Sequence, residues 1–190
     1  MARKKENIWN LPNALTMIRM LLIPVYWFVF MAGHTGWGLA IFAAASITDL
    51  LDGHIARKYQ LITDFGKLMD PLADKLMVLS VMLSLAIRGM APWAALLIIL
   101  CKEAIMVLGG LLLYKKGVVV YSEKIGKAAQ ALTVCGLILC FFGDRLTESL
   151  GFPLHTVVLW CAVALTLAAL CFYVKRALAL NREASQRQDP

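Results

Sequence analysis

Four aspartates stand at helical spacing in two neighbouring segments of the chain. Asp49 and Asp52 are three residues apart and Asp70 and Asp74 are four apart, so each pair shares one face of a helix. Residues 58–65 connect the two segments, and this connection is short enough to make the helices antiparallel neighbours. All four carboxylates can therefore converge at one end of the two helices.

A carboxylate cluster in apolar surroundings is unstable without counter-charges. An aspartate at the bilayer centre costs about 2.5–3.5 kcal/mol on insertion scales, and four carboxylates in a small space repel one another. Protons or divalent cations must neutralise them. An oxygen-only ligand set without histidine or cysteine suits Mg²⁺ or Mn²⁺ rather than zinc. Two such ions are a recurring device for displacement at phosphorus.

Three residues beside the aspartates could admit a ligand. Gly53 and Gly66 each lower helix stability relative to alanine, and their missing side chains would let a ligand approach the aspartate faces. Arg57 supplies a fork of donors suited to a phosphate. Taken singly, each has a simpler interpretation, because a glycine in a membrane helix is usually a packing contact and Arg57 fits the basic excess on the cytoplasmic side.

The composition of the chain indicates the surroundings of these helices. The 190 residues are 61% hydrophobic and 16% charged, with a mean hydropathy of +0.73, whereas a soluble domain is roughly half apolar and a quarter charged. A water-soluble globule, a disordered chain and a collagen-like repeat are thereby excluded. The five cysteines lie in apolar runs without a C-x-x-C pair, which argues against a disulfide framework or a zinc site.

The apolar runs predict an all-α integral membrane bundle of six transmembrane helices. We expect one domain over 1–190, with a polar tail from about residue 181. The first run is predicted to be a retained membrane helix and not a signal peptide, because it is long and no A-x-A site follows it. The predicted spans are 14–32, 37–57, 67–88, 91–114, 125–142 and 154–178, and the turns between them lie at 33–36, 89–92, 117 and 143–153.

Basic residues set the expected orientation. Lys and Arg total 19 against 12 Asp and Glu, a net charge of +7, and most lie in the connections on one side of the predicted bundle. The opposite connections hold only Arg88 and Arg145. The positive-inside rule therefore predicts a multi-pass protein of the cell membrane with both termini and the aspartate ends in the cytoplasm. No stretch of the chain forms a basic face with interleaved aromatic residues, which is the pattern typical of nucleic-acid binding.

The residues around the aspartates resemble the signature of the CDP-alcohol phosphatidyltransferase family. The pattern is Asp49-x-x-Asp52-Gly53-x-x-Ala56-Arg57, eight residues, then Gly66-x-x-x-Asp70-x-x-x-Asp74. Every fixed position matches, including the gap, and the length and six spans match as well, so the resemblance covers nearly the whole chain. It implies transfer of a phosphatidyl-type group from a CDP-linked donor to an alcohol, with release of CMP.

The same resemblance implies roles for these residues. Two divalent cations, Mg²⁺ or Mn²⁺, would be held by the four aspartates, and Asp74 would also act as general base on the acceptor hydroxyl. The CDP pocket would be shaped by Gly53, Ala56, Arg57 and Gly66. A homodimer is implied by the resemblance alone.

The start of the first span resembles the phosphatidylglycerophosphate synthase branch of the family. The matching residues are Asn10-Leu11-Pro12-Asn13-x-Leu15-Thr16-x-x-Arg19. Asn13 and Thr16 could donate hydrogen bonds to the nucleotide or its phosphates, and helix capping is the alternative for Asn13. Arg19 lies one turn inside the helix, where it needs an anionic partner or must extend to the surface.

We therefore expect an enzyme that transfers a phosphatidyl group from CDP-diacylglycerol to glycerol-3-phosphate and forms phosphatidylglycerophosphate in phospholipid biosynthesis. An anionic acceptor requires a positive pocket, and Lys102 could contribute to it or form a buried ion pair with Glu103. After Lys127 the chain reads Ala-Ala-Gln, where the branch often has Lys-Thr. The expected acceptor residues are Arg19, Lys67, Lys75, Lys102 and Lys127.

Three alternatives remain open. The same chemistry could serve phosphatidylglycerol, which would give cardiolipin, or serine or inositol. A divalent-cation transporter could use the four aspartates, but the outer halves of the spans are apolar and offer no polar path. A non-catalytic scaffold predicts the loss of an aspartate, and none is missing.

Overall fold

The computed structural model describes residues 10–59, 63–115 and 124–186. All regular secondary structure in these ranges is helical, in seven helices, which confirms the all-α prediction. The chain divides into two compact units, Met1–Arg88 and Gly89–Pro190. The first unit carries all four predicted aspartate ligands.

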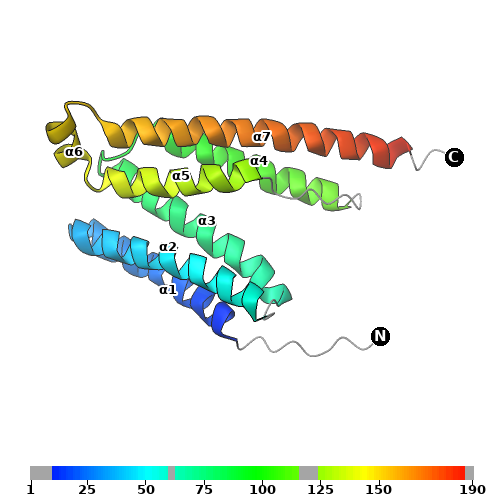
Figure 1. Ribbon diagram of the computed structural model, residues 1–190, viewed down its shortest axis with the longest axis horizontal. Coiled ribbons are helices and arrows are strands. Elements are labelled where there is room, and N and C mark those ends of the chain that lie inside the picture. Colours follow the sequence, from blue (N-terminus) through cyan, green and yellow to red (C-terminus); the bar gives the residue numbers. More distant parts are fainter. Residues whose placement is uncertain (1–9, 60–62, 116–123, 187–190) are drawn as a thin grey trace. The chain divides into compact units, whose positions relative to one another are not determined.

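Three helices form the first unit: α1 (Leu11–Met31), α2 (Thr35–Lys58) and α3 (Asp64–Ile87) (Figure 1). α1 begins after Asn10, whose side chain accepts a hydrogen bond from the backbone N–H of Asn13 at 2.9 Å. α3 begins after Thr63, whose hydroxyl accepts from the backbone N–H of Gly66 at 3.0 Å. Both helices therefore start at side-chain caps.

α1 packs against both other helices of the first unit. Near its C-terminal end, the Tyr26 hydroxyl lies 2.6 Å from the Ser84 hydroxyl, and Arg88 donates to the Phe30 carbonyl oxygen at 3.1 Å. α1 and α3 therefore run parallel, because the contact made by the later residue of α1 is with the later residue of the pair at the end of α3. A β-carbon at Gly38 would lie 2.8 Å from the Phe30 ring, so α2 passes close to this end of α1 and runs antiparallel to it.

The second unit contains α4 (Trp93–Lys115), α5 (Lys124–Cys140), α6 (Gly143–Leu150) and α7 (Leu154–Gln186). α7 packs against each of the other three, and Figure 1 shows α5 running beside it. A β-carbon at Gly136 would lie 3.3 Å from the Cα of Leu159. The absent side chain therefore allows α5 and α7 to approach closely.

Each of the six predicted spans coincides with a helix, but two details of the prediction were wrong. The connection 143–153 is not only a turn, because α6 occupies its first part and ends at Gly151, which has a φ of 75°. The axis bends by 83° between α5 and α6. α7 also continues past 178 to Gln186, so the start of the polar tail is helical.

Three of the described helices are long and apolar enough to cross a membrane. The qualifying stretches are Leu11–Met31, Trp93–Leu111 and Leu154–Leu180, and the bent pair α5–α6 makes a fourth if it is counted as one span. Only 17–22% of the residues in the three windows are buried within the protein, so most of their apolar side chains face outward, as in a bilayer. α2 and α3, which carry the aspartates, are not in this set.

Candidate functional site

A stripe of polar side chains follows one face of α1. Asn13, Thr16 and Arg19 are spaced three residues apart, so they lie on successive turns of the same face. All three are buried, although α1 is otherwise strongly apolar. We call these three residues the α1 polar stripe, and each contacts a different part of α2 or α3.

Arg19 contacts the first predicted metal ligand. Its Nη1 lies 2.8 Å from Oδ1 of Asp49, and their side chains are 1% and 37% exposed. Asp49 belongs to α2, and the next residue of the stripe, Thr16, contacts Asp70 of α3 one turn earlier on α1. The anionic partner that Arg19 requires inside the apolar helix is therefore a carboxylate of α2.

Thr16 contacts the predicted ligand on the other helix. Its hydroxyl is hydrogen-bonded to Oδ1 of Asp70 and also lies 3.1 Å from the Pro12 carbonyl oxygen one turn earlier. A hydroxyl donating to a carboxylate forms a charge-assisted bond, which is stronger than a bond between neutral groups. Asp70 is thus held by α1 in the same way as Asp49, by its Oδ1 atom.

Asn13, the third residue of the α1 polar stripe, contacts the start of α3. Its side-chain Nδ2 donates to the Thr63 hydroxyl oxygen at 3.0 Å, and the same hydroxyl caps α3. Capping of α1 falls to Asn10, so the capping alternative for Asn13 was wrong. Thr63 was not among the predicted site residues, although a threonine just before a predicted helix start is a typical N-cap.

Gly66 lies directly against this contact. A β-carbon on Gly66 would be 2.7 Å from Oδ1 of Asn13, 3.2 Å from the Thr63 hydroxyl and 3.7 Å from Oδ2 of Asp70. The glycine therefore provides the space that Asn13 occupies. This packing role exists alongside the predicted contribution of Gly66 to a CDP pocket, which stays a prediction.

The remaining predicted site residues of the first unit fall into two groups. Asp74 and Lys75 are half-buried on α3, one turn beyond Asp70. The side chains of the other residues lie outside the described part of the structure, although their backbone is helical: Asp52, Gly53, Ala56, Arg57 and Lys67.

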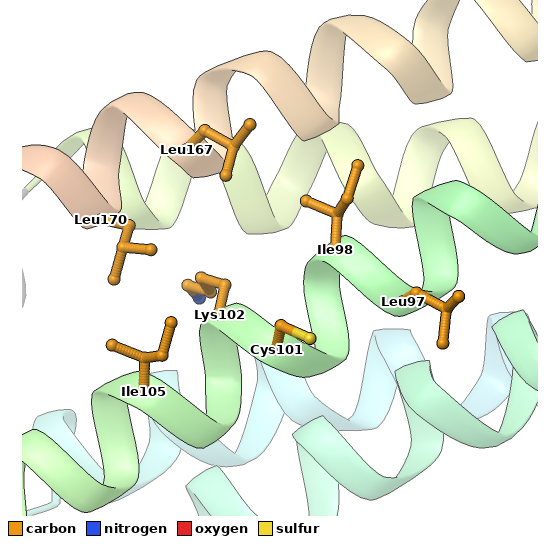
Figure 2. A pocket seen from close by; sticks show the side chains of 7 residues that line it. All are labelled: Leu97, Ile98, Cys101, Lys102, Ile105, Leu167 and Leu170. Carbon is orange, nitrogen blue, oxygen red and sulfur yellow. The ribbon is translucent and has the colours of Figure 1, made fainter.

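Lys102 and Lys127 belong to the second unit. Lys102 forms an ion pair with Glu103 at 2.5 Å, with side chains 15% and 12% exposed, which confirms the predicted ion pair. Lys102 also lines a largely apolar cavity of about 250 Å³ between α4 and α7 (Figure 2). Lys127 is exposed on α5.

The described aspartates offer the donor type that a hard cation prefers. Within the described residues, no group of three or more His, Cys, Asp or Glu is arranged to hold a metal ion; the side chain of Asp52 lies outside that part of the structure. Asp49 and Asp70 come from two helices and contact neighbouring residues of the α1 polar stripe, and both present oxygen ligands. Such oxygens suit Mg²⁺ or Mn²⁺, so the residues present are compatible with the predicted cation.

These features define a class of protein: an all-helical membrane protein with an acidic centre assembled from α2 and α3 on the polar face of α1. The family model for CDP-alcohol phosphatidyltransferase matches residues 9–168. The chain belongs to this family, whose members are transferases of substituted phosphate groups and generally depend on divalent cations. The resemblance found in the aspartate pattern is thereby confirmed.

Curated relatives match over most of their length. The CDP-diacylglycerol–glycerol-3-phosphate 3-phosphatidyltransferase of Bacillus subtilis is 33% identical over 181 residues, which cover 85% of this chain and 92% of the relative. A probable phosphatidylglycerophosphate synthase of Mycobacterium tuberculosis is 34% identical over 187 residues, covering 92% and 84%. The CDP-diacylglycerol–glycerol-3-phosphate 3-phosphatidyltransferase of Rickettsia felis is 34% identical over 172 residues, covering 87% and 94%.

Proposed function

We propose that this protein transfers the phosphatidyl group of CDP-diacylglycerol to glycerol-3-phosphate, releasing CMP and forming phosphatidylglycerophosphate. The proposal is carried by the contacts of Asp49 and Asp70, from two different helices, with neighbouring residues of the α1 polar stripe. The family match and the names of the relatives support the same donor and acceptor.

In this proposal the acidic centre binds two divalent cations. Asp49, Asp52, Asp70 and Asp74 would hold them, and the ions would offset the negative charge of the diphosphate and of the departing CMP. Arg57 would lie near a phosphate, where its planar fork suits two oxygens at once. Asn13 and Thr16 already bond to Thr63 and Asp70, so we assign them to the framework of the donor pocket.

Asp74 is the proposed general base. It lies one helical turn from Asp70 on the same face of α3. The acceptor hydroxyl oxygen would form a bond to the phosphorus that carries the diacylglycerol, and the bond from that phosphorus to the CMP oxygen would break. Asp74 would accept the hydroxyl proton, and CMP would leave with the bridging oxygen.

The phosphate group of the acceptor is anionic, so its binding requires basic side chains. We assign this role to Lys67, Lys75 and Lys127, together with the charge of Arg19, since Lys102 is already paired with Glu103. The lipid tails of the donor would remain in the bilayer while its head reaches the acidic centre. We further propose that six helices span the cell membrane, that both termini and the acidic centre face the cytoplasm, and that the chain forms a homodimer.

The test is CMP release by purified protein given CDP-diacylglycerol and Mn²⁺ or Mg²⁺, with glycerol-3-phosphate, phosphatidylglycerol, serine and inositol offered separately. We expect release with glycerol-3-phosphate alone. Asp74→Asn should lower the rate by about 100-fold or more, because general-base catalysis contributes about 10²–10⁴-fold. Asp144→Asn, on the exposed surface of α6, is the matched control and should behave like the wild type.

Each other outcome has a definite meaning. Release with a different acceptor would replace glycerol-3-phosphate as the substrate and leave the transfer chemistry in place. No release with any acceptor, from protein that binds Mn²⁺, would overturn the proposal and favour a transporter or a scaffold.

A further inference from the structure

A buried arginine of α1 contacts a proposed metal ligand. The Arg19 side chain is 1% exposed, and its Nη1 lies 2.8 Å from Asp49 Oδ1. A guanidinium stays charged at every relevant pH. One permanent positive charge is therefore part of the acidic centre, whether or not a metal ion is bound.

This charge has two opposite effects on the centre. Without metal, Arg19 offsets the negative charge of the Asp49 carboxylate that it contacts, one turn along α1 from the residue that binds Asp70. When a divalent cation approaches, Arg19 repels the ion and already occupies one oxygen of its ligand. The same contact thus stabilises the metal-free protein and opposes metal binding.

We propose that Arg19 is a built-in counter-cation, a positioning residue that keeps Asp49 in place before metal binds and then competes with the metal for that carboxylate. The inference rests on the proposed function, because it takes Asp49 as a metal ligand. It assigns Arg19 a role toward the metal centre in addition to any contribution to the acceptor pocket. Its consequence is that Arg19 limits the affinity for divalent cations.

The test compares Mn²⁺ binding and thermal unfolding of the purified full-length protein. Free Mn²⁺ is measured by electron paramagnetic resonance, and unfolding is followed with and without Mn²⁺. Arg19→Met should bind Mn²⁺ at least tenfold more tightly than the wild type. Its metal-free unfolding midpoint should fall, and the increase on adding Mn²⁺ should exceed that of the wild type, because binding to the folded state alone raises stability.

Two further variants separate charge from shape. Arg19→Lys keeps one positive charge and should bind Mn²⁺ more weakly than Arg19→Met and Arg19→Gln do. Arg19→Gln removes the charge but can still hydrogen-bond to Asp49, and it should bind Mn²⁺ more tightly. The glutamine variant carries the test if Arg19→Met does not fold.

The matched control is an arginine at the other end of the same helix pair. Arg88 also fastens α3 to α1, by a hydrogen bond to the Phe30 carbonyl and by its position over the Phe30 ring, 5.3 Å from the centroid. Arg88→Met should lower the metal-free midpoint without changing the affinity for Mn²⁺. A change confined to the Arg19 variants therefore reports on the acidic centre and not on the loss of a helix contact.

The outcomes distinguish this inference from the proposed function. Unchanged or weaker Mn²⁺ binding by both Arg19→Met and Arg19→Gln, with normal binding by the wild type, would overturn the role of Arg19 alone. Failure of the wild type to bind Mn²⁺ would overturn the proposed metal centre and this inference together.

Discussion

The side chain of Asn13 fills the space that a β-carbon on Gly66 would need. Its Oδ1 lies 2.7 Å from that position, closer than a real β-carbon contact allows, and its Nδ2 is bonded to the Thr63 hydroxyl. The glycine of the family pattern therefore has a local packing reason in this chain. The start of α3 and the first turn of α1 can approach only because residue 66 has no side chain.

Gly66→Ala should displace Asn13 and lower both the unfolding midpoint and the rate of CMP release. Overpacking of this kind typically costs about 1–3 kcal/mol. Adding Asn13→Ala should restore part of the stability in the double variant, because the clash disappears. Differential scanning calorimetry and the CMP assay measure both effects.

The control for this prediction is Gly36→Ala in α2, where an added β-carbon meets nothing within 4 Å. That variant should be neutral or slightly more stable, since alanine favours a helix. Equal losses in Gly36→Ala and Gly66→Ala would contradict the packing role.

Thr16→Val removes the hydroxyl that donates to Asp70 while keeping the shape of the side chain. Hydrogen bonds to charged groups contribute about 1.5–3 kcal/mol, so we expect Mn²⁺ affinity to fall by roughly 10–100-fold as Asp70 loses its orientation. Thr16→Ser should remain close to the wild type. A titration of CMP release against Mn²⁺ concentration measures the change.

Thr133→Val is a matched control, because Thr133 is also a buried threonine and donates to a backbone carbonyl one turn earlier. It lies on α5, in the other unit. If it weakens Mn²⁺ binding as much as Thr16→Val does, the effect of Thr16 is one of general stability.

Tyr26→Phe should separate stability from catalysis. The Tyr26 hydroxyl is buried 2.6 Å from the Ser84 hydroxyl, toward the end of α1 away from the polar stripe. Its loss should lower the free energy of unfolding by about 1 kcal/mol, visible in chemical denaturation. The values of kcat and of the KM for each substrate should stay within about twofold of the wild type, and a large fall in kcat would show that this end of the unit affects the acidic centre.

Lys127→Met tests the acceptor pocket. Lys127 is exposed on α5, so its replacement should leave the unfolding midpoint unchanged. We expect the KM for glycerol-3-phosphate to rise about tenfold, because one contact to a charged group is lost, while the KM for CDP-diacylglycerol stays constant. Steady-state kinetics with each substrate varied in turn measures both constants. A higher KM for CDP-diacylglycerol with an unchanged KM for glycerol-3-phosphate would place Lys127 at the donor site instead.

Local sequence was enough to predict the helices and the family. Apolar runs placed all six predicted helices, because helix formation depends on local composition and length. The spacing of Asp49 and Asp52, and of Asp70 and Asp74, carried the family resemblance. α6 was missed because eight mainly polar residues between glycine and proline signals resemble a turn.

The side chains that contact Asp49 and Asp70 could not be predicted from the sequence, because they depend on how the helices pack. Thr16 and Asp70 are 54 residues apart in the chain, and Asn13 and Thr63 are 50 apart. Helical periodicity places residues on a face, but it does not specify which helix that face meets. The partners of Arg19 and Thr16, and the need for glycine at residue 66, follow from the packing of α1 against both α2 and α3.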